Sequence, residues 1–305
     1  MIDTPLLVAL QAIAHAGTVS GAAARLSLSP SAVSQQLARL ERMVGLPLFE
    51  RTQRRMLITP AGETLLATAT DVLARLAALD EVLAAHRGST RGRLHVGTFP
   101  SAGATIVPPL LAALLRARPD VDVELSVGEP FELEPAVSAG DVDVAFVYRY
   151  ARVPSAWPPG LWRRHIRDDP LWLALPATHR LAGRRQVRLR ELAGESWIST
   201  GPETAGETSL QRATAEAGFA PDVRHRTRDY EMTQSLVAAG LGVAVIPELC
   251  LDLGGRSGVA FVRPADKLAT REVFLIGRDS AVNPLVTELV GVVGAGRPPA
   301  RRASS

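Results

Sequence analysis

Hydrogen-bonding side chains recur at helical spacing near the start of the chain. Ser31, Ser34, Gln35 and Arg39 would share one face of a helix. Hydroxyl, amide and guanidinium groups are the donors and acceptors that base edges and phosphates require. A basic cluster follows about a dozen residues later, formed by Arg51, Thr52, Gln53, Arg54 and Arg55. These residue types indicate non-covalent recognition of a polyanion.

The positive charge of the chain is concentrated in the same region. The 305 residues have a formal net charge of +3. Residues 1–60 hold six arginines against Asp3, Glu41 and Glu50, so this segment alone carries +3 and the remainder sums to zero. A small basic module joined to a neutral body favours nucleic acid as a partner.

No catalytic or metal-binding set stands out in the rest of the sequence. The six histidines show no metal-ligand pairing at helical spacing, and there is no Gly-x-Ser-x-Gly motif. Gly240 and Gly242 begin a dinucleotide-binding pattern, but Val245 occupies the third glycine position. The single cysteine, Cys250, excludes an intrachain disulfide, and its role as a redox sensor or as buried filler stays open. We therefore expect no enzyme, no bound metal and no cofactor.

The composition is that of a folded protein. Hydrophobic residues make up 47% of the chain and charged residues 21%, which excludes a wholly disordered chain. No run of eighteen uncharged apolar residues predicts a membrane span, and the first residues lack the pattern of a secretion signal. We expect a cytoplasmic protein without membrane contact.

Three helices must position the polar groups near the N-terminus. Apolar residues at three- and four-residue steps predict a first helix that ends at Gly17. An alanine-rich helix follows over residues 21–26, and a third over 30–44 with Ser29 as its N-cap. A short helix, a tight turn and a capped helix form a helix-turn-helix, whose last helix can enter a major groove.

Two short strands complete this unit. Residues 46–48 and 56–58 would form a wing with the basic cluster at its tip. Spacing alone leaves open the alternative of three packed helices beside a solvated charged loop.

The sequence around the predicted turn resembles a known family. Residues 22–37, 45–51 and 57–62 are similar to the winged helix-turn-helix of LysR-type transcriptional regulators, and the match runs over roughly residues 2–62 without a gap. The resemblance implies a recognition helix and a wing that bind double-stranded promoter DNA. The DNA-binding residues expected from it are Ser29, Pro30, Ser31, Ser34, Gln35, Arg39, Arg51, Thr52, Arg54 and Arg55.

A long helix with an apolar seam follows the wing. Its a/d positions continue for nearly three heptads and are occupied by Leu65, Ala69, Val72, Leu76, Leu79 and Leu83. This seam could pack on its own domain or pair with a copy of itself, and we favour pairing because helix-turn-helix proteins commonly bind two half-sites as dimers. The resemblance implies the same homodimer, a homotetramer, and RNA polymerase as a further partner.

Strands and helices alternate from residue 91 onward. This order predicts parallel sheets with right-handed crossovers, and crossings near 147–151 and 267–272 predict two hinged lobes. The resemblance implies an effector-binding domain like a periplasmic binding protein. The expected architecture is α + α/β, with a winged helix-turn-helix (1–62), a linker helix (63–90), an effector-binding domain (91–295; lobe I 91–149 and 272–295, lobe II 150–271) and a disordered tail (296–305).

A small-molecule effector is expected in the cleft between the lobes. Open α/β sheets bind ligands beyond the carboxyl ends of their strands, and a free helix N-terminus there favours an anion. Ordinary helix capping by Ser101 and Thr200 remains an alternative. The candidate effector-binding residues are Thr98, Phe99, Pro100 and Ser101 in the first lobe, Ser199, Thr200 and Gly201 in the second, and Glu129, Tyr148 and Arg228 beside them.

The sequence therefore predicts a DNA-binding transcriptional regulator whose promoter binding is modulated by a small molecule. The alternative is a ligand-binding protein whose N-terminal domain contacts protein instead of DNA. The effector itself is not fixed, because Glu129 and Glu203 near the cleft would disfavour a simple carboxylate unless they pair with Arg149 or Arg228.

Overall fold

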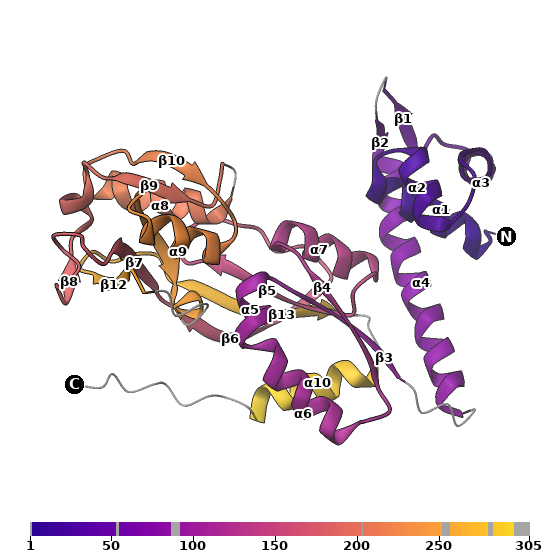
Figure 1. Cartoon of the computed structure of the whole chain (residues 1–305). Coiled ribbons are helices and arrows are strands. Elements are labelled where there is room, and N and C mark those ends of the chain that lie inside the picture. The colour runs from indigo at the N-terminus through magenta and orange to yellow at the C-terminus, as the bar shows by residue number, and fades with distance from the viewer. Residues whose placement is uncertain are drawn as a thin grey trace.

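The chain folds into a small helical domain, one long helix and two α/β lobes (Figure 1). The computed structural model describes residues 2–52, 55–86, 92–202, 204–251, 257–279 and 283–295. In the part of the chain so described, no helix is long and apolar enough to cross a membrane, and no group of three metal-ligating side chains comes together.

Capping side chains and glycines set the ends of the N-terminal helices. Gly17 and Gly45 adopt left-handed conformations after the first and third helices, and the hydroxyl of Ser29 accepts from the amide of Ala32 at 3.2 Å. The hydroxyl of Thr18 caps the second helix by accepting from the amide of Gly21. The helices are α1 (Thr4–Ala16), α2 (Val19–Leu26) and α3 (Pro30–Val44).

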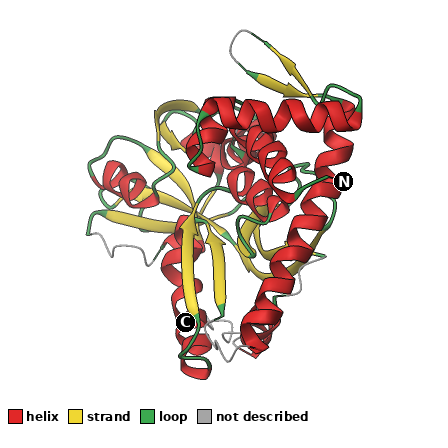
Figure 2. Ribbon diagram, turned by 90° about the vertical axis from the view of Figure 1, so that its right-hand side faces the viewer, coloured by secondary structure: helices red, strands yellow, loops and turns green. Residues whose placement is uncertain are grey.

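A common core joins these helices to the wing. The small residues Ala22 and Ala23 are buried, which lets α1 and α2 approach closely, and Leu37 of α3 packs in the same cluster. The wing strands are β1 (Phe49–Arg51) and β2 (Met56–Ile58), which pair antiparallel and project from the domain (Figure 2).

The first wing strand begins later than the 46–48 segment that we expected. Leu48 is fully buried, and its amide donates to the carboxylate of Glu41 at 2.9 Å instead of to the other wing strand. Strand pairing therefore starts only at Phe49.

The long helix α4 (Pro60–His86) grows out of the N-terminal domain. Thr59 caps it by accepting from the amide of Gly62 at 3.1 Å. Gly62 must lack a side chain, because a Cβ there would collide with the carbonyl oxygen of Leu48. With 27 residues at about 1.5 Å each, the helix is about 40 Å long and extends well past the domain that starts it.

The first lobe is built on a mixed five-stranded sheet in the order β4-β3-β5-β13-β6. Strand β3 is parallel to β4 and β5, whereas β13 is antiparallel to β5 and β6. The expectation of an all-parallel sheet is therefore wrong for this lobe. The strands are β3 (Arg93–Thr98), β4 (Asp122–Val127), β5 (Val144–Tyr150), β6 (Leu161–Asp169) and β13 (Arg271–Arg278).

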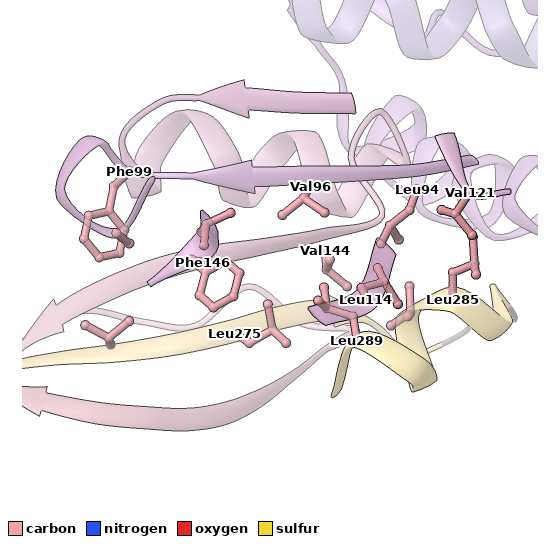
Figure 3. Packing of buried hydrophobic residues seen from close by; sticks show 14 of the residues in the cluster. Leu94, Val96, Phe99, Leu114, Val121, Val144, Phe146, Leu275, Leu285 and Leu289 are labelled. Carbon is pink, nitrogen blue, oxygen red and sulfur yellow. The ribbon is translucent and has the colours of Figure 1, made fainter. Parts of the chain in front are cut away.

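Helices pack on both sides of this sheet. The larger core lies between the sheet and two of the helices, where Leu94, Val144 and Leu275 from the strands meet Leu114 and Leu289 (Figure 3). The helices of this lobe are α5 (Pro100–Thr105), α6 (Val107–Ala117), α7 (Pro130–Ala139) and α10 (Pro284–Ala295).

The second lobe has a six-stranded sheet in the order β10-β9-β11-β7-β12-β8, with Trp197 fully buried in its core. Its strands are β7 (Leu171–Pro176), β8 (Gln186–Val187), β9 (Ser196–Ser199), β10 (Asp222–Arg226), β11 (Val243–Pro247) and β12 (Val259–Pro264). Its helices are α8 (Ala205–Glu216), α9 (Tyr230–Ala238) and the short turns η1 (Leu189–Leu192) and η2 (Glu248–Cys250).

The boundary between the lobes differs from the sequence-based division, which gave residues 150–271 to the second lobe. Strand β6 lies in the first sheet, because it pairs with β13 from Leu161 to Asp169. The chain therefore crosses to the second lobe between β6 and β7, not near 147–151, and returns between β12 and β13.

Candidate nucleic-acid interface and ligand cleft

Helix α3 separates its apolar and polar residues onto different faces. Val33, Leu37 and Leu40 are buried in the core of the domain. Ser29, Pro30, Ser31, Gln35 and Arg39 are exposed, and Ser34 is half-buried. Six of the expected DNA-binding residues therefore stand on the outer side of a helix that fits a major groove.

The wing places further polar groups beside this helix. Thr52 closes the wing turn, since its amide donates to the carbonyl of Arg55 and its hydroxyl accepts from the Arg55 amide. Both residues are exposed. Arg51 pairs with Met56 through the strand register, but its side chain lies outside the described part of the structure, as does the whole of Arg54.

Helix and wing meet at one shallow groove. The groove has a volume of about 370 Å³ and includes Pro30, Ser34, Thr52 and Arg55. Thr18, the N-cap of α2, also lines the groove and was not among the expected residues. A threonine directly after a left-handed glycine is a recognisable N-cap signal that could have identified it.

Arg39 already has an anionic partner. Its guanidinium lies 2.8 Å from the carboxylate of Asp3, and both side chains are about half exposed. An exposed pair of this kind contributes only about 0–1 kcal/mol, so a DNA phosphate can replace Asp3 at little cost.

The seam of α4 is divided between two environments. Leu65 and Ala69 pack on the core of the N-terminal domain. Val72, Leu76 and Leu79 are 40%, 39% and 51% exposed in the single chain. The side chain of Leu83 lies outside the described residues. The first part of the seam therefore anchors the helix, and the next three members leave an apolar stripe open.

A buried ion pair occupies the junction of the two lobes. Arg271 and Asp169 are cross-strand neighbours at the two chain crossings, and both are buried. The guanidinium donates to one oxygen of Asp169 at 2.7 Å and to the hydroxyl of Ser101 at 2.8 Å. The other oxygen of Asp169 accepts from the Leu249 amide of the second lobe. One ion pair thus fastens elements of both lobes.

Aromatic rings enclose this pair. The guanidinium carbon lies 5.0 Å from the ring centroids of both Phe99 and Tyr148. Burial is the largest single effect and lowers the pKa of Arg271, but Asp169 acting together with Tyr230, Tyr150 and Cys250 raises the pKa above its ordinary value. Burial raises the pKa of Tyr150 and of Tyr230, so both remain neutral phenols at physiological pH.

Cys250 lies close to the same junction. Burial raises the pKa of its thiol to about 12, and the side chain is fully covered. A thiol in this state is a poor nucleophile, which favours the packing role over the redox-sensor role.

Most of the expected effector-binding residues are committed to contacts within the chain. Thr98, Phe99 and Ser101 are buried, and only Pro100 of that segment is exposed. Ser199 and Thr200 line a cavity of only about 20 Å³. The hydroxyl of Thr200 lies 2.7 Å from that of Thr204, and the amide of Gly201 donates to the carboxylate of Glu207.

The larger cavity of the cleft lies next to these residues. It has a volume of about 250 Å³ and opens between α7 and β5 of the first lobe and the start of α8 in the second. Glu129 and Tyr148, both expected, line it, and the Tyr148 hydroxyl donates to the Glu129 carboxylate at 2.6 Å. The remaining lining residues are Pro130, Phe131, Glu134, Arg149, Tyr150, Val153, Ser155, Ala156, Thr204 and Ala205.

None of those remaining residues was expected in the effector site. They lie in the first turns of α7, at or just after the carboxyl end of β5, and at the start of α8, and the end of a strand is the signal that could have suggested some of them. Arg228, which was expected, lies with its guanidinium carbon 5.3 Å from the Phe131 ring and joins the lobes beside this cavity. Glu203 lies outside the described residues.

Family models match almost the whole chain. The model described as "Bacterial regulatory helix-turn-helix protein, lysR family" matches residues 5–63, and the model described as "LysR substrate binding domain" matches residues 87–296. The two matches cover the N-terminal domain and both lobes.

Individual relatives agree with these models. The chain is 34% identical over 296 residues to the small neutral protease regulatory protein of Streptomyces coelicolor, covering 94% of this chain and 90% of the relative. It is 33% identical over 240 residues to the HTH-type transcriptional regulator ShiR of Corynebacterium glutamicum, covering 77% of this chain and 79% of the relative.

Solved structures share the fold. A full-length OxyR variant from Pseudomonas aeruginosa has a TM-score of 0.69 at 21% identity, with 98% of both chains covered. Full-length CbnR in complex with its target DNA has a TM-score of 0.54 at 24% identity, covering 96% of this chain and 99% of CbnR.

Replacing Arg271 by methionine should destabilise the protein strongly. The change leaves the Asp169 carboxylate buried without its cation, which costs about 3–5 kcal/mol of unfolding free energy. Chemical denaturation measures the loss. Arg185→Met is the control, since Arg185 is exposed and its replacement should change stability by less than about 0.5 kcal/mol. Equal stability of the two variants would contradict the role of the pair.

Proposed function

This chain belongs to the LysR family of DNA-binding transcriptional regulators, and we propose that a small molecule held between its lobes controls its binding to promoters. The protein is a regulator with a DNA-binding domain and an effector-binding domain, and it is not an enzyme. The alternative in which the N-terminal domain contacts only protein has no support from the matched family. Binding to chromosomal DNA supports the expected cytoplasmic location.

The DNA contact is assigned to the outer face of α3 and to the wing. Ser31, Ser34 and Gln35 carry the groups that read base edges, and they stand on the exposed side of the helix. Thr52 and Arg55 line the same groove from the wing, where a cation would contact phosphate or the minor groove.

The assembly is a homodimer formed through α4. Three neighbouring seam residues leave apolar side chains exposed along a helix about 40 Å long, which supports pairing with a second copy. A dimer would present two recognition helices to half-sites about 34 Å apart, or a multiple of that distance. A homotetramer and contact with RNA polymerase are proposed on family membership alone.

The position of helix α7 is the observation that supports this proposal, because the helix connects the effector cleft with the DNA-binding domain. Its first residues, Pro130 and Phe131, line the cleft cavity. At its other end, the carbonyl of Ala139 accepts from the side-chain amide of Gln11 at 2.5 Å. Figure 1 shows α7 on the side of the first lobe that faces the N-terminal domain.

An ion pair completes this contact. Asp141, just after α7, pairs with Arg25 at the end of α2, and its carboxylate lies 3.9 Å from a ring nitrogen of His15. A ligand that moves the start of α7 would therefore shift the contact at its end, which is a physical route for unequal effector affinity in two states.

The interface between the domains is loosely filled, which allows such a shift. A cavity of about 710 Å³ lies between α1 and α4 on one side and the end of α7 on the other, with residues such as Leu66 and Pro135 in its walls. Polar contacts beside a large void can be exchanged at lower cost than a close-packed core.

Substitutions on the recognition surface should separate base reading from phosphate binding. Gln35→Ala should relax preference at particular base pairs by about 1–3 kcal/mol, because the amide reads base edges. Arg55→Ala should weaken binding to all sequences and reduce the salt slope by about one. Fluorescence anisotropy with promoter DNA at several salt concentrations measures both effects.

The control for this experiment is Arg42→Ala. Arg42 is exposed on α3 but donates to the carbonyl of Ala38 and does not line the groove. If Gln35→Ala and Arg55→Ala both bind like this control, the recognition surface is wrongly assigned.

Leu76→Asp should dissociate the dimer, because a carboxylate would be buried in the apolar seam. Sedimentation velocity measures the assembly state. Leu115→Asp is the matched control, since Leu115 is similarly exposed, at 37%, but lies on α6 away from the seam. An unchanged assembly in the Leu76 variant would remove α4 from the dimer interface.

Reversing the charge of Asp141 should release the N-terminal domain from the first lobe. With spin labels on cysteines introduced at the exposed positions Ala38 and Arg116, Asp141→Arg should broaden the distance distribution. The double variant Arg25→Asp with Asp141→Arg should narrow it again, because the pair is restored with opposite polarity. A partly exposed pair contributes about 0.2–1 kcal/mol, so DNA affinity should change by up to about fivefold. A distribution that Asp141→Arg leaves unchanged would contradict the contact.

A further inference from the structure

The charges around the cleft cavity are arranged by lobe. On the side of the first lobe, Glu129 and Glu134 contribute two carboxylates. Glu134 lies 2.5 Å from the guanidinium of Arg149, and both side chains are largely buried. Arg149 is held further by the Trp157 ring, whose centroid lies 4.2 Å from its guanidinium carbon. Glu134 and Arg149 therefore neutralise each other.

Glu129 has a neutral hydrogen-bond partner in this cavity. Its carboxylate accepts from the Tyr148 hydroxyl, and burial raises the pKa of Tyr148 well above its usual value, so this partner is a neutral donor. No cationic side chain forms an ion pair with Glu129 among the residues that the structure describes. A ligand cation in the cavity would supply the missing charge.

The second lobe contributes a helix N-terminus to the cavity. Thr204 and Ala205 line the cavity at the N-terminus of α8, a helix of twelve residues. The first amides of a helix and its dipole favour an anion. Arg228 stands nearby over Phe131. Glu207 in the first turn of α8 does not line this cavity; it lines a different hollow and pairs there with Arg226.

We propose that the effector is a zwitterion, an α-amino acid with an apolar side chain, and this inference rests on the proposed function. Its ammonium group would contact Glu129, and its carboxylate would contact the start of α8 and Arg228. Phe131, Val153 and Ala156 provide the apolar wall for its side chain. The ligand would then bridge the two lobes through its own two charges.

The size of the cavity and the charged groups around it disfavour larger ligands and ligands with a single charge. A cavity of about 250 Å³ is below the range of about 300–1,000 Å³ that is typical of drug-sized ligands, which suits a small metabolite. A simple carboxylate has no cationic group that could pair with the Glu129 side chain. A simple amine leaves the positive end of α8 without an anion.

The experiment is calorimetric titration of the full-length protein with the twenty L-amino acids. For each one that binds, the N-acetyl derivative and the methyl ester are titrated in parallel, because they lack the ammonium charge and the carboxylate respectively. Both derivatives should bind at least tenfold more weakly, a loss of about 1.4 kcal/mol. Benzoate and hexylamine test the classes with a single charge.

The variant Glu129→Gln keeps the size of the side chain and removes its charge, and it should lower amino-acid affinity at least tenfold. Glu124→Gln, on the exposed edge strand β4, is the matched control and should bind like wild type. Thermal unfolding of both variants confirms that they fold.

The outcomes separate the effector class from the regulatory function. If no amino acid binds, if benzoate or hexylamine binds as tightly, or if affinity survives Glu129→Gln, the zwitterion assignment is overturned. If an amino acid binds as expected but leaves the affinity for promoter DNA unchanged, the control of promoter binding fails while the ligand class stands.

Discussion

The effector domain depends on the buried pair of Arg271 and Asp169. A charge at this position is tolerated only with its partner, because an unpaired ion in the interior costs several kcal/mol. The pair lies where the chain crosses between the lobes, and its remaining hydrogen bonds reach Ser101 in one lobe and the Leu249 amide in the other. The chain crosses between the lobes at two places, and the pair holds the lobes together at this junction.

This constraint also decides where open space remains between the lobes. The guanidinium of Arg271 and the rings of Phe99 and Tyr148 fill the centre of the junction, and the hydroxyl of Ser101 is already engaged. The available space is displaced toward α7 and the start of α8. Because α7 also ends against the N-terminal domain, one helix links the proposed ligand cavity with that domain.

Helix α4 combines anchoring and assembly in one seam. Its first turns complete the core of the winged domain, which fixes the direction in which the helix leaves, and Gly62 allows the close approach that this requires. The apolar residues beyond the domain find no cover within the chain in the described part of the helix. If a second copy covers them, the two recognition helices of the dimer would have a fixed orientation relative to each other.

Local sequence signals were sufficient to predict the N-terminal unit and the order of the domains. Caps, glycine stops and apolar periodicity are local, so the bounds of α3 and the exposed face with Ser31, Gln35 and Arg39 could be predicted, whereas the start of β1 depended on the contact of Leu48 with Glu41. Only the tertiary structure placed β6 in the first sheet and brought Arg271 beside Ser101, 170 residues away, because strand pairing and buried charge depend on neighbours that are distant in sequence. The position of the cleft cavity also depends on distant neighbours. Thr98 and Ser199 are the last residues of β3 and β9, where ligand residues often lie, but both are buried, and the open space lies beside Glu129 and Phe131.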